Sequence, residues 1–381
     1  MTSRAIRVCG AALTVLATAS ACSFGAPPPD DSGDPPDLPS NSSSSSKSAD
    51  PSVTSDVVAD NLKVPWGITF LPDKSALVTE RDTGKILSVT PPKNKGDKAK
   101  VDTVQTVGGV SHSGDGGLLG IAASPDYAKD KTVYIYYTTD SDNRIAKLKD
   151  GGKPKPIVTG IPKSDTRNGG QLAFGPDGDL YATTGDAEKA DDAQDKKSLA
   201  GKILRMDTKG KAPSDNPFGK SLVYSYGHRD SAGLAWDSKK RLYATEFGDK
   251  EDELNKIKPG GNYGWPQVEG ASSGGTYESP VTTWKTSEGE CAGAAFAESA
   301  MVTACLTGQR LRTFKFDKKG KLDGKPAESQ NNELGRLRAV AAAPDGTLWI
   351  STSNREHGGQ PHKGDDKIIR VIAGGSAEGQ T

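Results

Sequence analysis

From residue 60 onward, the chain repeats one short pattern of apolar and polar positions. A run of small and apolar residues is followed by a turn that contains Asp, usually as Pro-Asp, and then by a second run rich in Leu, Tyr, Val and Thr. Asp-Gly favours a tight turn between two strands, because Gly accepts the positive φ that such turns require. The first runs of the six copies lie at 67–70, 118–123, 171–174, 233–236, 293–296 and 340–343, of which the copy at 293–296 is degenerate.

This repeat predicts an all-β fold, a six-bladed β-propeller of four-stranded antiparallel blades. The copies are roughly 45 to 60 residues apart, which suits one four-stranded blade each. A copy near the end of the chain can close the ring with the start and leave no exposed sheet edge. Five or seven blades and a two-sheet sandwich are the alternatives, but a sandwich needs no repeat of this length.

The residues before the repeat predict two further segments. Arg4 and Arg7 precede a mostly apolar run at 8–19, which is too short to span a bilayer and ends in Ala19-Ser20-Ala21-Cys22. We therefore predict a lipoprotein-type signal peptide over 1–22. Residues 23–55 are rich in Ser and Pro and predict a disordered tether, which leaves 56–381 for the propeller.

The signal predicts export to the outer face of the cell membrane, with lipidated Cys22 as the only membrane anchor. The alternative is a secreted protein in which the Cys is incidental. Lys plus Arg and Asp plus Glu both total 49, so the formal net charge is zero and no nucleic-acid partner is expected.

Two cysteines lie beyond the signal segment, Cys291 and Cys305. An exported compartment permits disulfides, and this pair would close a short loop worth about 3 kcal/mol. We predict a structural disulfide in preference to a redox role. A metal site is disfavoured because no His or Cys cluster accompanies the pair.

Three segments are more specific than the repeat, and together they resemble the soluble quinoprotein glucose/sorbosone dehydrogenase family. The resemblance runs from about residue 60 to 373, and it implies a six-bladed propeller that holds pyrroloquinoline quinone (PQQ) and calcium and oxidises a sugar. The segments are Gly114-Asp115-Gly116-Gly117-Leu118-Leu119-Gly120, then Asn168-Gly169-Gly170-Gln171-Leu172, and then Tyr226-Gly227-His228-Arg229-Asp230 with its continuations Glu246-Phe247-Gly248 and Asn262-Tyr263-Gly264-Trp265-Pro266.

The position of the family's catalytic base is occupied by Arg167. In the family a His precedes the Gly-Gly-Arg-Leu-type stretch, and the matching segment here is Thr166-Arg167-Asn168-Gly169-Gly170. Arginine stays protonated and has no acceptor lone pair, so it cannot act as a general base. Arg167 is either an anion contact at the pocket or a solvated loop residue.

Other positions that the resemblance assigns to the cofactor are mixed. Asp115 and Asp230 stand where the family has Gln and Asn, and Thr307 stands where it has a Lys. A carboxylate is electrostatically unfavourable beside a tricarboxylate cofactor. Arg229 is retained as a catalytic-site residue. Arg336 and Arg338 match two late arginines, and their spacing on a strand would put both on one face to bind one anion, the alternative being a surface ion pair.

The resemblance also implies a calcium site in the loop of the third segment. Glu251, Asp252 and Glu253 offer hard oxygen ligands, and Gly248 and Asp249 could add backbone carbonyls. Glu253 and the carbonyl of Tyr263 match the family's calcium ligands. The alternative is a solvated acidic face.

Two functions remain open on the sequence alone. One is an exported oxidoreductase that oxidises a sugar or related alcohol with PQQ and calcium, with His112 or His357 as a replacement base and His228 as a hydrogen-bonded structural residue. The other is a catalytically impaired propeller that binds a glycan, a cell-wall fragment or a protein at the same pocket. Whether the chain is an enzyme, its substrate and its oligomeric state stay undetermined at this point.

Overall fold

A computed structural model describes residues 54–92, 97–149, 151–272 and 274–372 of the 381-residue chain. The predicted signal peptide, Cys22 and nearly all of the predicted tether lie outside the described residues. Within the described part, no helix combines the length and apolar character needed to cross a membrane.

The described residues form six four-stranded antiparallel sheets, as predicted. Blade 1 contains β2 (Pro65–Phe70), β3 (Ala76–Glu80), β4 (Lys85–Thr90) and β5 (Lys100–Thr106). Blade 2 contains β6 (Leu118–Ala123), β7 (Thr132–Thr138), β8 (Asn143–Lys149) and β9 (Lys155–Ile161). Blade 3 contains β10 (Leu172–Phe174), β11 (Leu180–Thr184), β12 (Lys202–Met206) and β13 (Val223–Tyr226).

The second half of the ring repeats this order. Blade 4 contains β14 (Ser231–Trp236), β15 (Leu242–Glu246), β16 (Glu251–Ile257) and β17 (Thr282–Lys285). Blade 5 contains β18 (Cys291–Ala297), β19 (Ala300–Cys305), β20 (Arg310–Lys315) and β21 (Ala327–Ser329). Blade 6 contains β22 (Leu337–Ala342), β23 (Leu348–Thr352), β24 (Ile368–Ile372) and β1 (Thr54–Ala59). The helical segments of the described residues are α1 (Tyr127–Asp130), η1 (Ala190–Ala193) and η2 (Thr286–Glu288).

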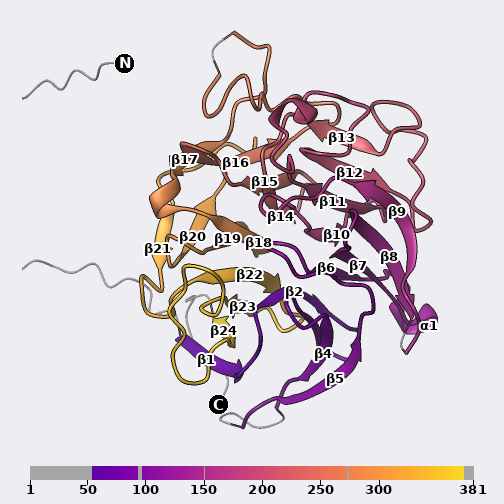
Figure 1. The fold of residues 1–381 in the computed structure, drawn as a ribbon. Coiled ribbons are helices and arrows are strands. Elements are labelled where there is room, and N and C mark those ends of the chain that lie inside the picture. Colours follow the sequence, from indigo (N-terminus) through magenta and orange to yellow (C-terminus); the bar gives the residue numbers. More distant parts are fainter. Residues whose placement is uncertain (1–53, 93–96, 150, 273, 373–381) are drawn as a thin grey trace, which may run out of the picture. The chain divides into compact units, whose positions relative to one another are not determined.

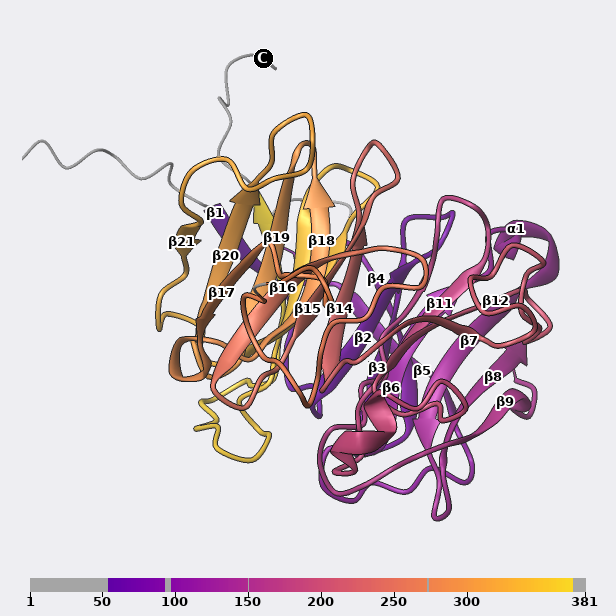
Figure 2. The same cartoon turned by 90° about the horizontal axis from the view of Figure 1, so that it is seen from above.

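The ring is closed by the start of the described chain. β1 is the outermost strand of blade 6 and pairs antiparallel with β24, where Asp56 stands opposite Arg370 and accepts a hydrogen bond from its Nε at 3.0 Å. The innermost strands β2, β6, β10, β14, β18 and β22 surround the centre in Figure 1. Turned by 90°, Figure 2 shows strands of blades 4 and 5 lengthwise. Each blade packs against its two neighbours, although each remains a separate four-stranded sheet with its own edge strands, so the expectation of a ring without sheet edges is corrected.

The repeated Asp explains why each copy folds as a hairpin. The side chains of Asp73, Asp177, Asp237 and Asp345 each accept a hydrogen bond from the backbone N–H two residues later, at 2.9 to 3.2 Å. This contact makes a turn with a side chain in place of a backbone carbonyl. After Asp177 and Asp345, the glycines at 178 and 346 take φ values of 86° and 83°.

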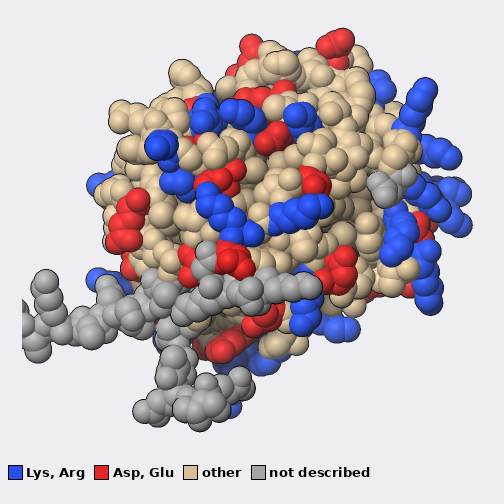
Figure 3. Space-filling model, turned by 90° about the horizontal axis from the view of Figure 1, so that it is seen from below, with Lys and Arg blue, Asp and Glu red and all other residues tan. Residues whose placement is uncertain are grey.

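The core lies between neighbouring blades. Trp66, Leu119, Tyr134, Leu172 and Leu204, from blades 1, 2 and 3, belong to one buried apolar cluster. Such shared clusters hold each blade against the next, and the loops that enter the innermost strands gain a rigid base. On the outer face in Figure 3, acidic and basic side chains are interspersed. The predicted absence of a nucleic-acid partner remains a prediction.

Candidate functional site

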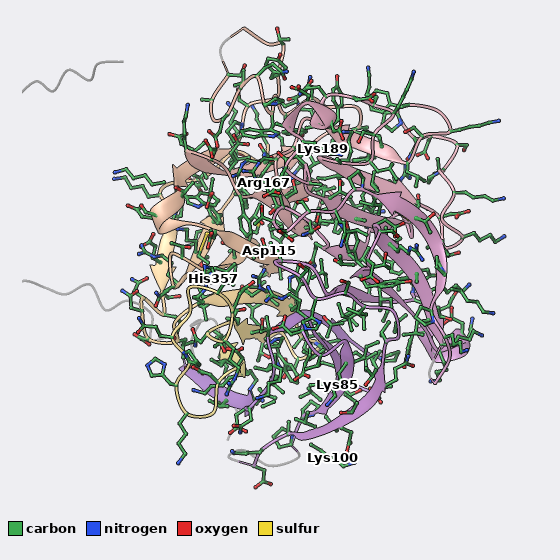
Figure 4. The ribbon with its side chains drawn as sticks, in the orientation of Figure 1. Lys85, Lys100, Asp115, Arg167, Lys189 and His357 are labelled. Atoms are coloured by element: carbon green, nitrogen blue, oxygen red, sulfur yellow. A yellow bond between two sulfur atoms is a disulfide. The ribbon has the colours of Figure 1, made fainter. Side chains whose placement is uncertain are left out.

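The residues predicted to form the site gather at one end of the ring, called the top face below. Asp115, Arg167, Asp230 and Arg336 all lie in segments that lead into innermost strands, namely β6, β10, β14 and β22. Because the innermost strands of a propeller run in the same direction along its channel, the segments before them meet at one mouth. Figure 4 shows Asp115 and Arg167 toward the centre of the ring, with Lys85 and Lys100 at its periphery.

Arg167 is held in an ion pair at this mouth. Its Nη1 lies 3.3 Å from Oδ2 of Asp186, a fully buried carboxylate, while the Arg167 side chain keeps 28% exposure. The same oxygen of Asp186 accepts the indole N–H of Trp265 at 2.9 Å. Arg167 therefore has a fixed carboxylate partner, and its remaining N–H groups can only donate hydrogen bonds.

Asp230 is the second unusual group of the mouth. Its Oδ1 accepts the backbone N–H of Gly169 at 2.9 Å, and the residue is buried. Burial, together with the negative charge of Asp115, raises the pKa of Asp230 to about 7. Asp115 keeps an exposed surface, yet the surrounding loops exclude enough water to raise its pKa as well.

Arg229 is positioned by the buried residues around it. Its backbone N–H donates to Oε1 of Glu246 at 2.5 Å, its Nη1 donates to the carbonyl of Phe247 at 3.1 Å, and its guanidinium lies over the ring of Trp265 at 5.5 Å. Its Nε is buried and has no hydrogen-bond partner among the described residues. An anion at this mouth would supply the missing acceptor.

His228 has the structural role predicted for it. The imidazole is fully buried, with Nδ1 at 2.8 Å from Oε2 of Glu246, Nε2 at 2.8 Å from the hydroxyl of Ser225, and the ring stacked on Tyr263 at 4.6 Å. Because Glu246 also binds the backbone of Arg229, His228 contributes to the placement of Arg229 and lies outside solvent reach.

Arg336 and Arg338 do not share one partner as the sequence suggested. Arg336 lies just before β22, and its Nη2 is 3.3 Å from Oε2 of Glu290. Arg338 lies in β22 and donates through Nη2 to both carboxylate oxygens of Glu356. The sequence predicted that both guanidiniums lie on one face to bind one anion, whereas in the structure each is bound by its own carboxylate, Glu290 just before blade 5 and Glu356 in blade 6.

Thr307 donates its hydroxyl to Glu290. Where the resemblance implies a cofactor-binding Lys, this chain thus has a neutral donor that stabilises a carboxylate. The Nε of Arg336 is buried without a hydrogen-bond partner among the described residues, as is that of Arg229. Both late arginines keep donors near the mouth, although their carboxylate partners reduce the net positive charge there.

The calcium residues come together only in part. Gly248, Glu253 and Tyr263 line one small cavity of about 10 Å³, together with Glu246 and Glu269. That volume suits a single water or ion. Burial and the charge of Glu246 raise the pKa of Glu253, so the carboxylate is poorly compensated within the protein.

Asp249 and Asp252 lie outside this cavity. Asp249 is exposed and its carboxylate is 3.7 Å from Nη2 of Arg229, while Asp252 is buried and accepts the indole N–H of Trp284 at 3.2 Å. Among the described residues, no three Asp, Glu, His or Cys side chains converge closely enough to hold a metal by themselves. A calcium ion would therefore depend on Glu253 with backbone carbonyls.

The two candidate replacement bases are exposed. His112 and His357 both lie at the surface, with His357 in the loop between β23 and β24. No hydrogen bond between described residues joins either imidazole to Arg167, Asp115 or Asp230. The structure gives no support for either His as a base.

Further residues of the site escaped sequence reasoning. Asp186, Glu290, Glu356 and Arg81 each bind a predicted site residue or its partner, and Arg81 donates to Glu356 at 2.5 Å. None belongs to the motifs that carry the resemblance. The only sequence signal was their position in Gly-rich or polar segments at strand ends, which many solvated residues share.

A sizeable cavity lies beside Arg336, between blades 5 and 6. It has a volume of about 400 Å³, and it is lined by Arg336, Asn332, Asn354, Gln309, His362 and Lys367 among others. This volume falls in the range of small-molecule sites. Asp115, Arg167, Arg229 and Asp230 do not line it.

The predicted disulfide is present. Cys291 and Cys305 are joined with an S–S distance of 2.02 Å and stand opposite each other in the β18–β19 pair. The bond secures the first residue of an innermost strand, directly after Glu290. It therefore helps to fix the loop that carries the carboxylate partner of Arg336.

Six antiparallel blades with arginines and buried carboxylates at one mouth define the class: a closed β-propeller with a charged top-face site. The family model described as Glucose / Sorbosone dehydrogenase matches residues 62–360, so the chain belongs to that family. This confirms the resemblance drawn from the sequence motifs.

Named relatives agree with this membership. The chain is 32% identical over 275 residues to quinoprotein glucose dehydrogenase B of Acinetobacter calcoaceticus, which covers 61% of this chain and 56% of that protein. It is 28% identical over 345 residues to the aldose sugar dehydrogenase YliI of Escherichia coli, covering 79% and 90%. The chain thus spans little more than half the length of the Acinetobacter relative.

A solved structure is similar over nearly its whole length. It is the PQQ-bound form of aldose sugar dehydrogenase from Streptomyces coelicolor, with 44% identity and a TM-score of 0.79. The match covers 84% of this chain and 98% of that one.

Proposed function

We propose that this protein is an exported dehydrogenase that binds PQQ at the top face and oxidises a sugar or related alcohol. The observation that carries the proposal is the 44% identity to a PQQ-bound aldose sugar dehydrogenase, in a chain that keeps Arg229 just before β14 and Arg336 and Arg338 at the start of β22. The unpartnered Nε atoms of Arg229 and Arg336 are donors that a carboxylated ligand would satisfy.

The unpartnered arginine donors fit a carboxylated cofactor such as PQQ, whereas the negative charges of Asp115 and Asp230 oppose its binding. Arg229, Arg336 and Arg338 would hold carboxylates of PQQ, and Glu253 with backbone oxygens would hold calcium beside Arg229. Bound PQQ supplies the hydride acceptor. Asp115 and Asp230 add negative charge at the same mouth, so we expect affinity to rise when either becomes neutral.

Export rests on the amino-terminal sequence. Residues 1–22 carry a basic start, a short apolar run and a terminal Cys, which favours anchoring through a lipid on Cys22. Incorporation of a labelled fatty acid by wild type and its loss in Cys22→Ser would support this localisation, and equal labelling would overturn it. Release of unlabelled wild type into the medium would support the secreted alternative.

The enzyme proposal is tested by loading purified wild type with PQQ and calcium. We expect quinone absorbance that stays with the protein after gel filtration, and reduction of an artificial electron acceptor with a panel of aldoses. Protein that retains no PQQ, or retains it without turnover on any sugar or alcohol, would refute the enzyme.

One observation favours the second candidate, a propeller that binds a glycan without turnover. Arg167 occupies the base position and is fixed on Asp186 at 3.3 Å, so no imidazole stands there. This candidate predicts thermal stabilisation by a glycan or cell-wall fragment without reduction of any acceptor. Arg167→His would then be expected to introduce turnover that wild type lacks.

A further inference from the structure

We infer that Asp230 accepts the hydroxyl proton of the substrate, as the general base of the proposed oxidation. The inference rests on the proposed function. Oxidation of an alcohol removes a hydride from carbon and a proton from oxygen, and a quinone takes only the hydride. The protein must therefore supply the proton acceptor, and a carboxylate of suitable basicity can do so.

The nitrogen groups near the mouth do not meet this need. Arg167 is a donor without a free lone pair and is bound to Asp186. His228 is fully buried between Glu246 and Ser225. The proton acceptor must therefore be a carboxylate that lies beside Arg167.

Asp230 lies against the same loop as Arg167. Its Oδ1 accepts the N–H of Gly169, two residues after Arg167, at 2.9 Å. Gly185 separates the two: a Cβ built there would lie 1.8 Å from the Arg167 carbonyl oxygen and 2.7 Å from Oδ1 of Asp230. Only a residue without a side chain lets the Arg167 loop and the Asp230 carboxylate approach this closely. Asp230 therefore lies directly beside the loop that carries Arg167.

The neighbouring carboxylates are already bound. Asp186 is fully buried, with Oδ1 accepting the N–H of Glu188 at 2.8 Å and Oδ2 contacted by Arg167 and Trp265. Glu356 and Glu290 are held by arginines. In Asp230, by contrast, Oδ2 receives no hydrogen bond from the described residues and the residue keeps 9% exposure, so we assign the substrate hydroxyl to this oxygen.

Asp115 is the remaining competitor, and its surroundings make it the weaker base. Exclusion of water and the charges of Glu356 and Glu290 raise the pKa of Asp115, but the fields of Arg338 and Arg81 oppose this rise. Asp230 is shielded from water, and the charges of Asp115 and Asp186 oppose its ionisation, while Arg229 and the Gly169 N–H favour it. Tyr136, buried beside it, donates its hydroxyl to the carbonyl of Asn168 at 3.0 Å. The balance leaves Asp230 a stronger base than an ordinary carboxylate.

The step balances with the groups already named. The substrate O–H bond breaks and its proton passes to Oδ2 of Asp230, while the C–H bond gives its hydride to the quinone. The alcohol is oxidised to a carbonyl, or a cyclic hemiacetal to a lactone, and the quinone is reduced. Protonated Asp230 then returns its proton to water at the mouth.

The test compares wild type with Asp230→Asn, both loaded with PQQ and calcium. Asparagine keeps an acceptor for the Gly169 N–H, so the fold and PQQ binding are expected to persist, with tighter PQQ binding because one negative charge is gone. Turnover is expected to fall about 10²- to 10⁴-fold, the usual contribution of a general base. Asp165→Asn, on the same loop, is the matched control for an exposed carboxylate and is expected to retain turnover within about twofold.

Three further readouts separate a base from a structural residue. Added formate should restore part of the turnover of Asp230→Ala, because it supplies a carboxylate in the vacated space. Asp115→Asn should move the acidic limb of the wild-type pH profile to lower pH, because it removes a charge that opposes ionisation of Asp230. In PQQ-free protein, an infrared band of a protonated carboxyl should disappear near pH 7 and be missing in Asp230→Asn.

These results distinguish failure of Asp230 as the base from failure of the proposed dehydrogenase function. Turnover by Asp230→Asn equal to wild type would overturn the base and leave the proposed function intact. Wild type that binds PQQ without turnover, together with an active Arg167→His, would overturn both, since the chain would then lack any base. Absence of turnover in both wild type and Arg167→His would likewise refute the proposed function, and the assignment of Asp230 as base would fall with it.

Discussion

Arg338 and Glu356 form a buried ion pair in which one guanidinium nitrogen donates to both carboxylate oxygens. Arg81 approaches the same carboxylate from the end of β3, at 2.5 Å, so Glu356 joins blade 6 to blade 1 where the ring closes. Burial opposes the charge of Glu356, but the fields of Arg338 and Arg81 outweigh it and lower its pKa to about 2. The group is thus a structural clamp beneath the mouth.

Removing this carboxylate should destabilise the ring severely. Glu356→Gln leaves the buried guanidinium of Arg338 without its ion-pair partner and leaves Arg81 paired with Asp82 alone, and loss of one partner of a buried ion pair typically costs about 3 to 5 kcal/mol. We expect a corresponding fall in the free energy of unfolding measured in urea. The control is Asp102→Asn, which removes the exposed partner of Lys100 and should cost less than about 1 kcal/mol. Equal effects of the two variants would show that the clamp contributes no more than a surface pair.

The ionisation of Asp230 should make stability fall as pH rises. Its pKa is about 7 in the folded protein against 3.8 ordinarily, so the folded state holds the proton longer than the unfolded state. Between about pH 4 and pH 7 the folded protein loses relative stability, by an upper limit of about 4 kcal/mol from the shift. Asp230→Asn should lose this contribution to the slope, while those of Asp252 and Asp366, whose pKa values burial raises to about 6, remain, and the variant should be more stable than wild type at pH 8. Parallel pH profiles of unfolding for the two proteins would contradict the assignment.

The fold was predictable because its information is local and repeated. Each copy carries its own turn Asp, and the contacts of Asp73, Asp177 and Asp345 with the following N–H groups form within three residues. Six similar hairpins, one in each blade, then favour a closed ring of six blades. The disulfide was predictable for a related reason, since Cys291 and Cys305 are the cysteines left after the signal segment.

The site was predictable only as a set of positions. Motif spacing located Asp115, Arg167, Asp230 and Arg336, but not their partners. Glu356 reaches Arg81 across 275 residues of sequence, and no local pattern announces that contact. The basicity of Asp230 also depends on burial beneath distant loops. The pairing of charges at the mouth depends on how the closed ring brings distant residues together, and the sequence alone does not show these contacts.

The disulfide should stabilise blade 5 and the loop that precedes it. The bond spans 14 residues, and a loop of about that length is worth about 3 kcal/mol through restriction of the unfolded chain. Replacement of both Cys291 and Cys305 by Ala should lower the unfolding free energy by about this amount, and reducing agent should have no further effect on the variant. If reducing agent leaves the unfolding midpoint of wild type unchanged while the thiols become free, the disulfide is not stabilising.

Calcium should stabilise the protein through Glu253, and this effect can be measured without PQQ. Glu253 is 6% exposed, and its oxygens accept the N–H of Gly270 at 2.5 Å and the amide of Asn255 at 2.9 Å. A cation in the adjoining cavity would relieve the repulsion between Glu253 and Glu246, so binding must favour the folded state. At calcium one hundredfold above its dissociation constant, mass action gives about 2.7 kcal/mol and a higher unfolding temperature.

Two variants separate this site from non-specific calcium effects. Glu253→Gln removes the charge and should abolish the calcium-dependent rise while raising the calcium-free unfolding temperature, because one of two repelling carboxylates is gone. Glu298→Gln changes an exposed carboxylate in the β18–β19 turn and should respond to calcium like wild type. A calcium response of equal size in wild type and Glu253→Gln would place the ion elsewhere. No response in wild type would remove calcium from the proposed cofactor set, because a cavity lined by buried carboxylates cannot accept the ion without a gain in folded-state stability.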